Sequence, residues 1–197
     1  YQLIYKIFLA KLNVLLYIND YIYTIINDIR IKMSLESFFN PKSVAVVGVS
    51  SDPSKLGAVV FNNLISANFK GKLYAINPKC AGQELFNKQC FASVKDCPEA
   101  IDLVVIVVPA KFCSATVDDC IVNGTKNISI ITAGFGEVGN HELEDEIAEK
   151  CKEHNINLLG PNCLGHISTF NNLNASFADG FPIKGNVAFI SQSGAYC

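Results

Sequence analysis

The sequence predicts an α/β fold in which a parallel sheet carries helices on both faces. Short apolar runs rich in β-branched residues recur from residue 43 onward, and they are nearly continuous rather than alternating. Such runs are typical of strands that are covered on both faces. Segments with the apolar spacing of helices lie between them. This strand–helix repetition with short links predicts right-handed crossovers and a parallel sheet.

Six strands and three helices are expected. The strands are centred on the apolar runs at residues 43–49, 72–77, 102–108, 128–132, 156–159 and 187–191. The helices occupy residues 57–67, 112–122 and 141–154. In the first helix Val60, Leu64 and Ala67 share one face. The third helix has acidic residues early and Lys150 and Lys152 late, which is the order that the helix dipole favours.

The composition excludes several classes of protein. The 197 residues are 50% hydrophobic and 17% charged, which argues against a disordered tail, a collagen-like repeat or a coiled coil. A formal net charge of −2 without a basic block argues against nucleic acid or an anionic membrane as the main partner. No two of the 8 cysteines have CxxC spacing, so no metal site is expected. A cytoplasmic protein with reduced thiols fits this pattern best.

Residues 1–32 differ in composition from the rest of the chain. They contain no Gly, Pro, Cys, Ser or Glu, and the sole Met of the chain, Met33, follows directly. This contrast predicts a leader translated from upstream sequence, with the natural start at Met33. Charged residues interrupt every window that is long enough to cross a bilayer, so a membrane span is not expected.

The first predicted strand leads into a loop with small polar residues. Parallel α/β sheets bind their ligands beyond the carboxyl ends of the strands, so this loop is a candidate site. Gly48 allows a tight turn, and Ser50 and Ser51 with the N–H groups of a helix start form a phosphate cradle. The spacing to the next glycine, Gly57, departs from the G-x-G-x-x-G fingerprint. An ordinary strand-to-helix turn is an equal alternative for this loop alone.

The second strand is followed by a cation. An NAD site has Asp or Glu at this point to bind the ribose hydroxyls, whereas this sequence has Lys79. A cation suits a phosphorylated ribose, so Lys79 favours NADP or coenzyme A over NAD. The structural alternative is an ordinary solvated lysine.

The later strands also end in loops that contain Gly or Pro. The sequences are VVPA, TAGFG and GPNCLG. Glycines let a ligand approach the main chain closely, and prolines fix the direction of the backbone. Five consecutive loops of this kind predict an extended groove along one edge of the sheet. After the sixth strand, two serines and a glycine at an expected helix start form a second anion site.

At these motifs the sequence resembles the ADP-forming acetate–CoA ligases, which are nucleoside-diphosphate-forming acyl-CoA synthetases. It is more distantly similar to the succinyl–CoA synthetase alpha subunit. The motifs occur in the order SLESFFNPKSVAVVGVS, NPK, VVIVVPAKF, IITAGFGEVG, LLGPNCLG and GNVAFISQSGA. The resemblance implies a Rossmann-like CoA-binding domain over residues 33–180. It also implies the truncated start of a second α/β domain over residues 181–197.

The resemblance implies coenzyme A as the cofactor and assigns roles to the loop residues. The implied coenzyme-binding residues are Ser50, Ser51, Asp52, Pro53, Lys79, Val108, Pro109, Thr132, Ala133 and Gly134. The first four would surround the diphosphate, the lysine would bind the phosphate-bearing nucleotide, and the others would line the pantetheine path. Asn162 and Cys163 would lie near the thioester and phosphate chemistry, with the thiol as a lining group rather than a nucleophile. The implied phosphate-binding residues are Ser191, Gln192, Ser193 and Gly194.

The implied reaction converts acyl-CoA, ADP and phosphate to free acid, CoA and ATP through an acyl phosphate and a phosphohistidine. The resemblance places the phosphohistidine beyond Cys197, in the following domain, so no catalytic residue is expected within this chain. It places ADP/ATP and Mg in an ATP-grasp domain or beta subunit, in an oligomeric full-length acid–thiol ligase. This chain alone is then expected to be inactive. Separately, His166 is expected to be a partly buried strand histidine. The alternatives are a CoA-binding regulatory module of a protein acetyltransferase-like protein and an NADP-binding Rossmann oxidoreductase.

Overall fold

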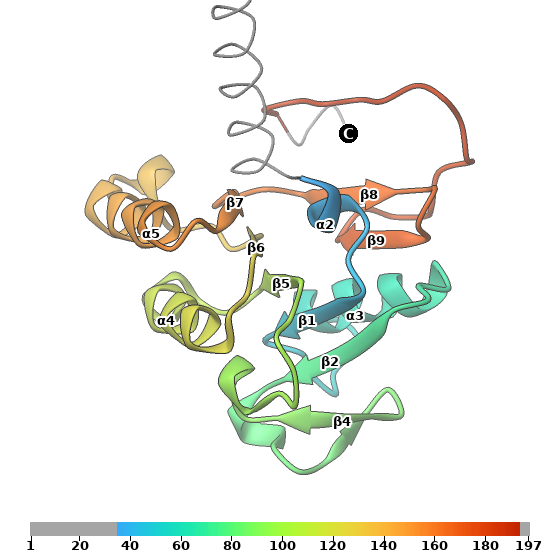
Figure 1. Ribbon diagram of the computed structural model, residues 1–197, viewed down its shortest axis with the longest axis horizontal. Coiled ribbons are helices and arrows are strands. Elements are labelled where there is room, and N and C mark those ends of the chain that lie inside the picture. Colours follow the sequence, from blue (N-terminus) through green and yellow to red (C-terminus); the bar gives the residue numbers. More distant parts are fainter. Residues whose placement is uncertain (1–34, 194–197) are drawn as a thin grey trace, which may run out of the picture. The chain divides into compact units, whose positions relative to one another are not determined.

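The computed structural model describes residues 35–193. The expected leader at residues 1–32 lies outside the described residues. Within the described part, a seven-stranded sheet has the order β3-β4-β2-β1-β5-β6-β7 (Figure 1). All its pairs are parallel except β3 with β4. The predicted parallel α/β sheet is therefore confirmed.

The sheet strands are β1 (Ser43–Val47), β2 (Lys72–Ile76), β3 (Glu84–Leu85), β4 (Lys88–Phe91), β5 (Leu103–Ile106), β6 (Asn127–Ile130) and β7 (Asn157–Leu159). The helices are α2 (Glu36–Phe39), α3 (Leu56–Ser66), α4 (Cys113–Asn123) and α5 (His141–Glu153). A separate antiparallel hairpin consists of β8 (Gly165–Ser168) and β9 (Leu173–Ser176). The first five predicted strands and all three predicted helices are present with shifted ends.

The strand order reverses between β1 and β5. The chain first builds β2 and β4 on one side of β1, and then returns to build β5, β6 and β7 on the other side. In the register, Val47 at the end of β1 pairs with Ile76 and Ile106. This is Rossmann-like topology, and in open α/β sheets of this kind ligands bind at the switch point beyond the carboxyl ends of the strands.

Both faces of the sheet are buried. Val104 and Val105 are neighbours on β5 and point to opposite faces, yet both are fully buried. Val104 packs in the cluster formed with α4 and α5, and Val105 packs in the cluster formed with α3 and β9. Figure 1 shows α4 and α5 together on one side and α3 on the other. The predicted placement of helices on both faces is confirmed.

The structure differs from the sequence predictions in three segments. The strand predicted at residues 187–191 is wrong, because the segment has no regular structure and Val187 and Ile190 are 90% and 95% exposed. It has no strand neighbour among residues 35–193, and an unpaired strand is not stable in water. The link between β2 and β5 contains β3 and β4, two strands that were not predicted. The β8–β9 hairpin was not predicted.

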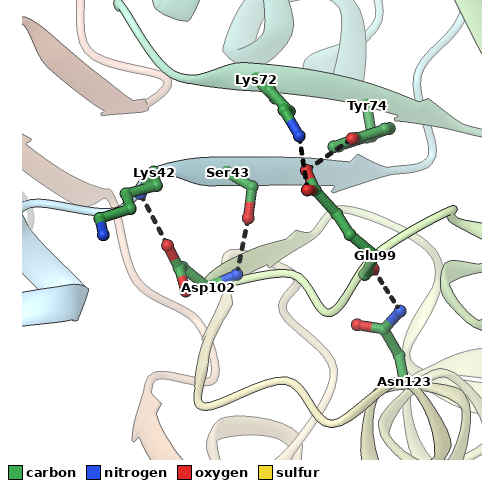
Figure 2. Close-up of polar contacts among 7 residues, drawn as sticks. All are labelled: Lys42, Ser43, Lys72, Tyr74, Glu99, Asp102 and Asn123. Carbon is green, nitrogen blue, oxygen red and sulfur yellow. Dashed lines mark hydrogen bonds and ion pairs between the residues drawn. The ribbon is translucent and has the colours of Figure 1, made fainter.

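Polar contacts hold the strands together at the amino-terminal edge of the sheet (Figure 2). The Asp102 carboxylate accepts a hydrogen bond from the backbone N–H of Lys42 at 2.7 Å. The backbone N–H of Asp102 donates to the Ser43 hydroxyl at 3.0 Å. These two contacts join the start of β1 to the start of β5.

A second cluster at the same edge joins β2 to the segment before β5. The Glu99 carboxylate accepts hydrogen bonds from Lys72 Nζ at 2.6 Å and from the Tyr74 hydroxyl at 2.7 Å (Figure 2). Asn123 Nδ2 donates to the Glu99 carbonyl at 3.0 Å. Burial and the contact with Glu99 raise the pKa of Tyr74 to about 12. The edge opposite the predicted ligand loops is therefore closed by polar contacts within the protein.

Candidate functional site

Two glycines allow the turn after β1 to pack tightly against α3. Gly48 has a φ of +101°, and a Cβ atom there would lie 2.8 Å from the carbonyl oxygen of Val107. At the start of α3, a Cβ atom on Gly57 would lie 2.1 Å from the carbonyl oxygen of Gly48. Gly48 supplies the tight turn and Gly57 the close helix–strand packing that two glycines supply in the dinucleotide fingerprint. The G-x-G-x-x-G pattern does not mark this pair, because Gly48 and Gly57 lie nine residues apart.

The segment from Ser50 to Ser54 forms a hydrogen-bonded turn before α3. Ser50 Oγ accepts from the Asp52 N–H at 3.1 Å. The Asp52 carboxylate accepts from the N–H of Ser54 at 2.9 Å and from its hydroxyl at 2.7 Å. These bonds hold the pKa of the Asp52 carboxyl below its ordinary value. Ser51 and Pro53 are exposed in the same turn.

Lys79 lies in the loop after β2, in a 3-10 turn over Pro78–Cys80. Its N–H donates to Asn77 Oδ1 at 3.0 Å, and Asn77 Nδ2 donates to the Val49 carbonyl at 2.7 Å. These contacts fasten the loop after β2 to the loop after β1. Lys79 is exposed and takes part in none of the ion pairs formed among residues 35–193.

The loops after β5, β6 and β7 are also joined. The Thr132 hydroxyl donates to the Val108 carbonyl at 2.6 Å. The Asn162 N–H donates to the Thr132 carbonyl at 2.9 Å. Pro109 is exposed next to the half-buried Val108. A continuous series of contacts therefore crosses the carboxyl edge of the sheet from the loop after β5 to the loop after β7.

Cys163 is held inside this edge. Its thiol donates to the Ile130 carbonyl at 3.3 Å and lies 3.8 Å from the Ser129 hydroxyl. Burial raises the pKa of the Cys163 thiol, which disfavours the thiolate that a nucleophile requires. The neighbouring Asn162 is exposed and has a left-handed φ of 53°. These features fit a lining thiol.

In the loop between β6 and α5, two carboxylates accept hydrogen bonds from backbone N–H groups, and the sequence did not predict these contacts. Glu137 accepts hydrogen bonds from the N–H groups of Gly134 and Phe135, the second at 3.2 Å. Glu144 accepts from the N–H of Gly136 at 2.9 Å. No spacing rule marks these residues, because the contacts form only when the loop folds back on itself.

Two parts of the expected site lie wholly or partly outside the described residues. In the exposed segment after β9, Ser191 Oγ accepts from the Ser193 N–H at 3.1 Å and donates to the Ser193 carbonyl at 3.0 Å. Gln192 is exposed between them, and Gly194 lies outside the described residues. Cys197, beyond which the phosphohistidine is expected, also lies outside them, so the structure does not test that expectation.

His166 lies on β8 beneath α2, so the prediction of a partly buried strand histidine is confirmed. Its Nε2 is 3.0 Å from the Phe38 carbonyl, and its ring centroid is 4.5 Å from that of Phe38. The Nδ1 atom is buried without a hydrogen-bond partner among the described residues. Burial lowers the pKa of His166 to about 4. The hydrogen bond with the Phe38 carbonyl raises this pKa, but by less.

Comparison with known proteins supports a coenzyme site. Residues 42–169 match the family described as CoA binding domain. The chain is 50% identical over 155 residues to acetate–CoA ligase (ADP-forming) of Methanocaldococcus jannaschii, covering 79% of this chain and 21% of that protein. It is 45% identical to the alpha subunit of acetate–CoA ligase (ADP-forming) II of Pyrococcus furiosus, covering 82% of this chain and 35% of the subunit. The chain therefore spans between about a fifth and a third of the length of these relatives.

A solved structure has the same fold. The dinucleotide forming acetyl-coenzyme A synthetase 1 of Ca. Korarchaeum cryptofilum, in complex with phosphate and ADP, matches with a TM-score of 0.79 and 46% identity. The match covers 82% of this chain and 34% of that one. Among residues 35–193, no helix has the length and apolar character that a bilayer span requires. Residues 42–169 match the family and the sheet is Rossmann-like, so the chain belongs to the CoA binding domain family.

Proposed function

We propose that this chain binds coenzyme A and forms the CoA-binding portion of an ADP-forming acyl-CoA ligase. The observation that carries the proposal is the meeting of five loops at the carboxyl edge of the sheet. Hydrogen bonds connect the loop after β2 to the loop after β1, and the loops after β5, β6 and β7 to one another. The family match and the names of the relatives support the same function.

In this proposal the nucleotide end of the coenzyme binds at the loops after β1 and β2. The diphosphate lies at the start of α3, where the first N–H groups of a helix have no partner within the helix. Ser50, Ser51 and Pro53 surround it. Asp52 shapes the turn through Ser54, because a carboxylate repels a phosphate and this one already has hydrogen-bond partners. Lys79, which has no ion-pair partner within residues 35–193, binds the 3′-phosphate.

The pantetheine arm then passes from the loop after β5 toward the loop after β7. Val108 and Pro109 supply apolar contacts, Ala133 supplies main-chain groups, and Thr132 and Gly134 flank it along the path. The thiol ends near Asn162 and Cys163. The raised pKa of Cys163 supports a lining role beside the thioester, because the protein thiol then remains protonated.

The proposed activity of the whole protein is the conversion of acyl-CoA, ADP and phosphate to free acid, CoA and ATP. Phosphate displaces CoA from the acyl carbon to form an acyl phosphate, whose phosphoryl group passes to a histidine and then to ADP. We assign that histidine to the second domain, which begins within residues 181–197 after a CoA-binding domain at residues 33–180. In this proposal an ATP-grasp domain or beta subunit binds ADP and Mg. The full-length protein is a cytoplasmic oligomer. One of the relatives is named as an alpha subunit, which supports the proposal that this protein has a partner subunit.

The test is calorimetric titration of the chain with CoA, dephospho-CoA and NADP. CoA should bind about fivefold more tightly than dephospho-CoA, because an exposed Lys79–phosphate contact contributes on that order. Lys79→Gln should remove this preference. Lys70→Gln is the matched control, because Lys70 is exposed before β2, at the other edge of the sheet. Equal binding of CoA and dephospho-CoA would contradict the role of Lys79, and preferential NADP binding would favour the oxidoreductase alternative.

A further inference from the structure

Three consecutive N–H groups in the loop after β6 donate to carboxylates. Gly134 and Phe135 donate to the two oxygens of Glu137, and Gly136 donates to Glu144. Successive N–H groups in a turn form a concavity that binds anions. In this protein its own side chains occupy that concavity. Hydrogen bonds to an ionised carboxylate are also stronger than those between neutral groups.

The same loop is fastened at several other points. Asn140 Nδ2 donates to the Gly134 carbonyl at 3.1 Å. Phe135 is fully buried in the cluster beneath α4 and α5. Gly134 has a φ of +110°, and a Cβ atom there would lie 3.2 Å from Ala110 Cβ. The loop after β6 thus lies against the loop after β5, and the contact with Glu137 fixes the orientation of its peptide groups.

The residue that this arrangement leaves available is Ala133. It is exposed, and its N–H and C=O groups have no hydrogen-bond partner within residues 35–193. The adjacent peptide N–H groups are taken by Glu137, while the Thr132 carbonyl is taken by Asn162. A donor and an acceptor on one exposed residue match a secondary amide, and the pantetheine arm of coenzyme A contains two such amides.

We propose that Glu137 is a positioning residue of the coenzyme site. It holds the loop after β6 in the conformation in which Ala133 presents its N–H and C=O groups to an amide of the pantetheine arm. Glu137 does not touch the coenzyme. The inference rests on the proposed function, because it assumes that CoA binds at this edge.

The test compares the CoA affinity of the chain with that of Glu137→Ala, Glu137→Gln and Glu142→Gln. Glu137→Ala should weaken CoA binding about tenfold, because two charge-assisted hydrogen bonds that orient the loop are lost. Glu137→Gln should weaken it less, since the amide oxygen can still accept one N–H. Glu142→Gln is the control, because Glu142 is an exposed acid in the first turn of the neighbouring helix α5 and its side chain has no hydrogen bond within residues 35–193.

Two further measurements separate positioning from a general loss of structure. Formate should restore most of the CoA affinity of Glu137→Ala, because the small carboxylate can occupy the vacated N–H groups, while chloride at equal ionic strength should not. In the NMR spectrum, the amide protons of Gly134 and Phe135 should move upfield in Glu137→Gln, as their bonds to an ionised group weaken.

The outcomes are distinguishable. Wild-type affinity in Glu137→Ala, or loss of affinity without rescue by formate, overturns the positioning role while CoA binding stands. Tighter CoA binding in Glu137→Ala also overturns it, because the carboxylate would then compete with the ligand for the N–H groups. If the wild-type chain binds no CoA, the proposed function itself fails.

Discussion

A partly buried histidine makes the stability of this domain depend on pH in a predictable way. His166 lies on β8 against the rings of Phe38 and Phe39, with centroid distances of 4.5 and 5.5 Å. Its Nε2 contacts the Phe38 carbonyl, and its Nδ1 has no partner within the described part of the chain. An imidazolium at this position would carry a second N–H with no acceptor. Protonation of the folded state is therefore costly.

The size of the effect follows from the two pKa values of His166. Burial lowers the pKa of the folded state from the ordinary 6.5 to about 4. As the pH falls, the unfolded chain takes up the proton first, so stability is present above pH 6.5 and is lost down to about pH 4. One pKa unit corresponds to about 1.4 kcal/mol, so the full loss is about 3 kcal/mol. About 2.5 kcal/mol of this is lost between roughly pH 7.5 and 4.5.

The assay is urea unfolding of the wild-type chain and of His166→Val at several pH values. Carboxyl groups also lose stabilising contacts in acid, but they are common to both proteins and cancel in the difference. The wild type should lose about 2.5 kcal/mol more than His166→Val across this range. His154→Gln is the control for replacing a histidine, because His154 is exposed at the end of α5.

Parallel stability curves for the wild type and His166→Val would refute this reasoning. An NMR titration gives a direct check, because the ring signals of His166 should stay in the neutral form down to about pH 5. Titration of these signals near pH 6.5 would show that the ring is not desolvated as the contacts with α2 indicate.

Two further predictions concern the two edges of the sheet. In Glu99→Gln the pKa of Tyr74, measured from the phenolate absorbance, should fall from about 12 but stay above 10, because burial raises it more than Glu99 does. A fall to 10 would show that Glu99, and not burial, causes the shift. Gly57→Ala should destabilise the domain by about 2 kcal/mol or more in urea unfolding, because the new Cβ overlaps the Gly48 carbonyl. Gly185→Ala, whose Cβ meets only an atom 3.9 Å away, is its control and should unfold like the wild type.

The fold was predictable where burial alone determines the structure. The runs that became β1 and β5 are apolar at nearly every position because both faces of these strands are covered. The segment 187–191 is similarly apolar and was predicted as a strand, but a strand also needs a neighbour, and that requirement is not visible in local composition. The β8–β9 hairpin was missed because it contains buried polar residues. Asn174 is buried there, and Asn63 on α3 donates to the Ser176 carbonyl at 2.9 Å.

The location of the candidate site was predictable, while part of its construction was not. The rule that ligands bind beyond the carboxyl ends of parallel strands identified the loops of Ser50, Lys79 and Thr132. Gly57 was not recognised as a packing glycine, because its role depends on how closely α3 approaches the turn after β1. Glu137 was missed because its partners are backbone groups, which carry no sequence signal.

The separation of the two edges has a consequence for how substitutions act on this domain. The contacts of Asp102 and Glu99 clamp the starts of β1, β2 and β5, whereas the candidate ligand loops follow the ends of the same strands. A substitution in one of the candidate ligand loops therefore leaves these contacts in place, because no residue of those loops takes part in them. Mutations that weaken ligand binding and mutations that weaken the strand arrangement should therefore fall at opposite ends of the same strands.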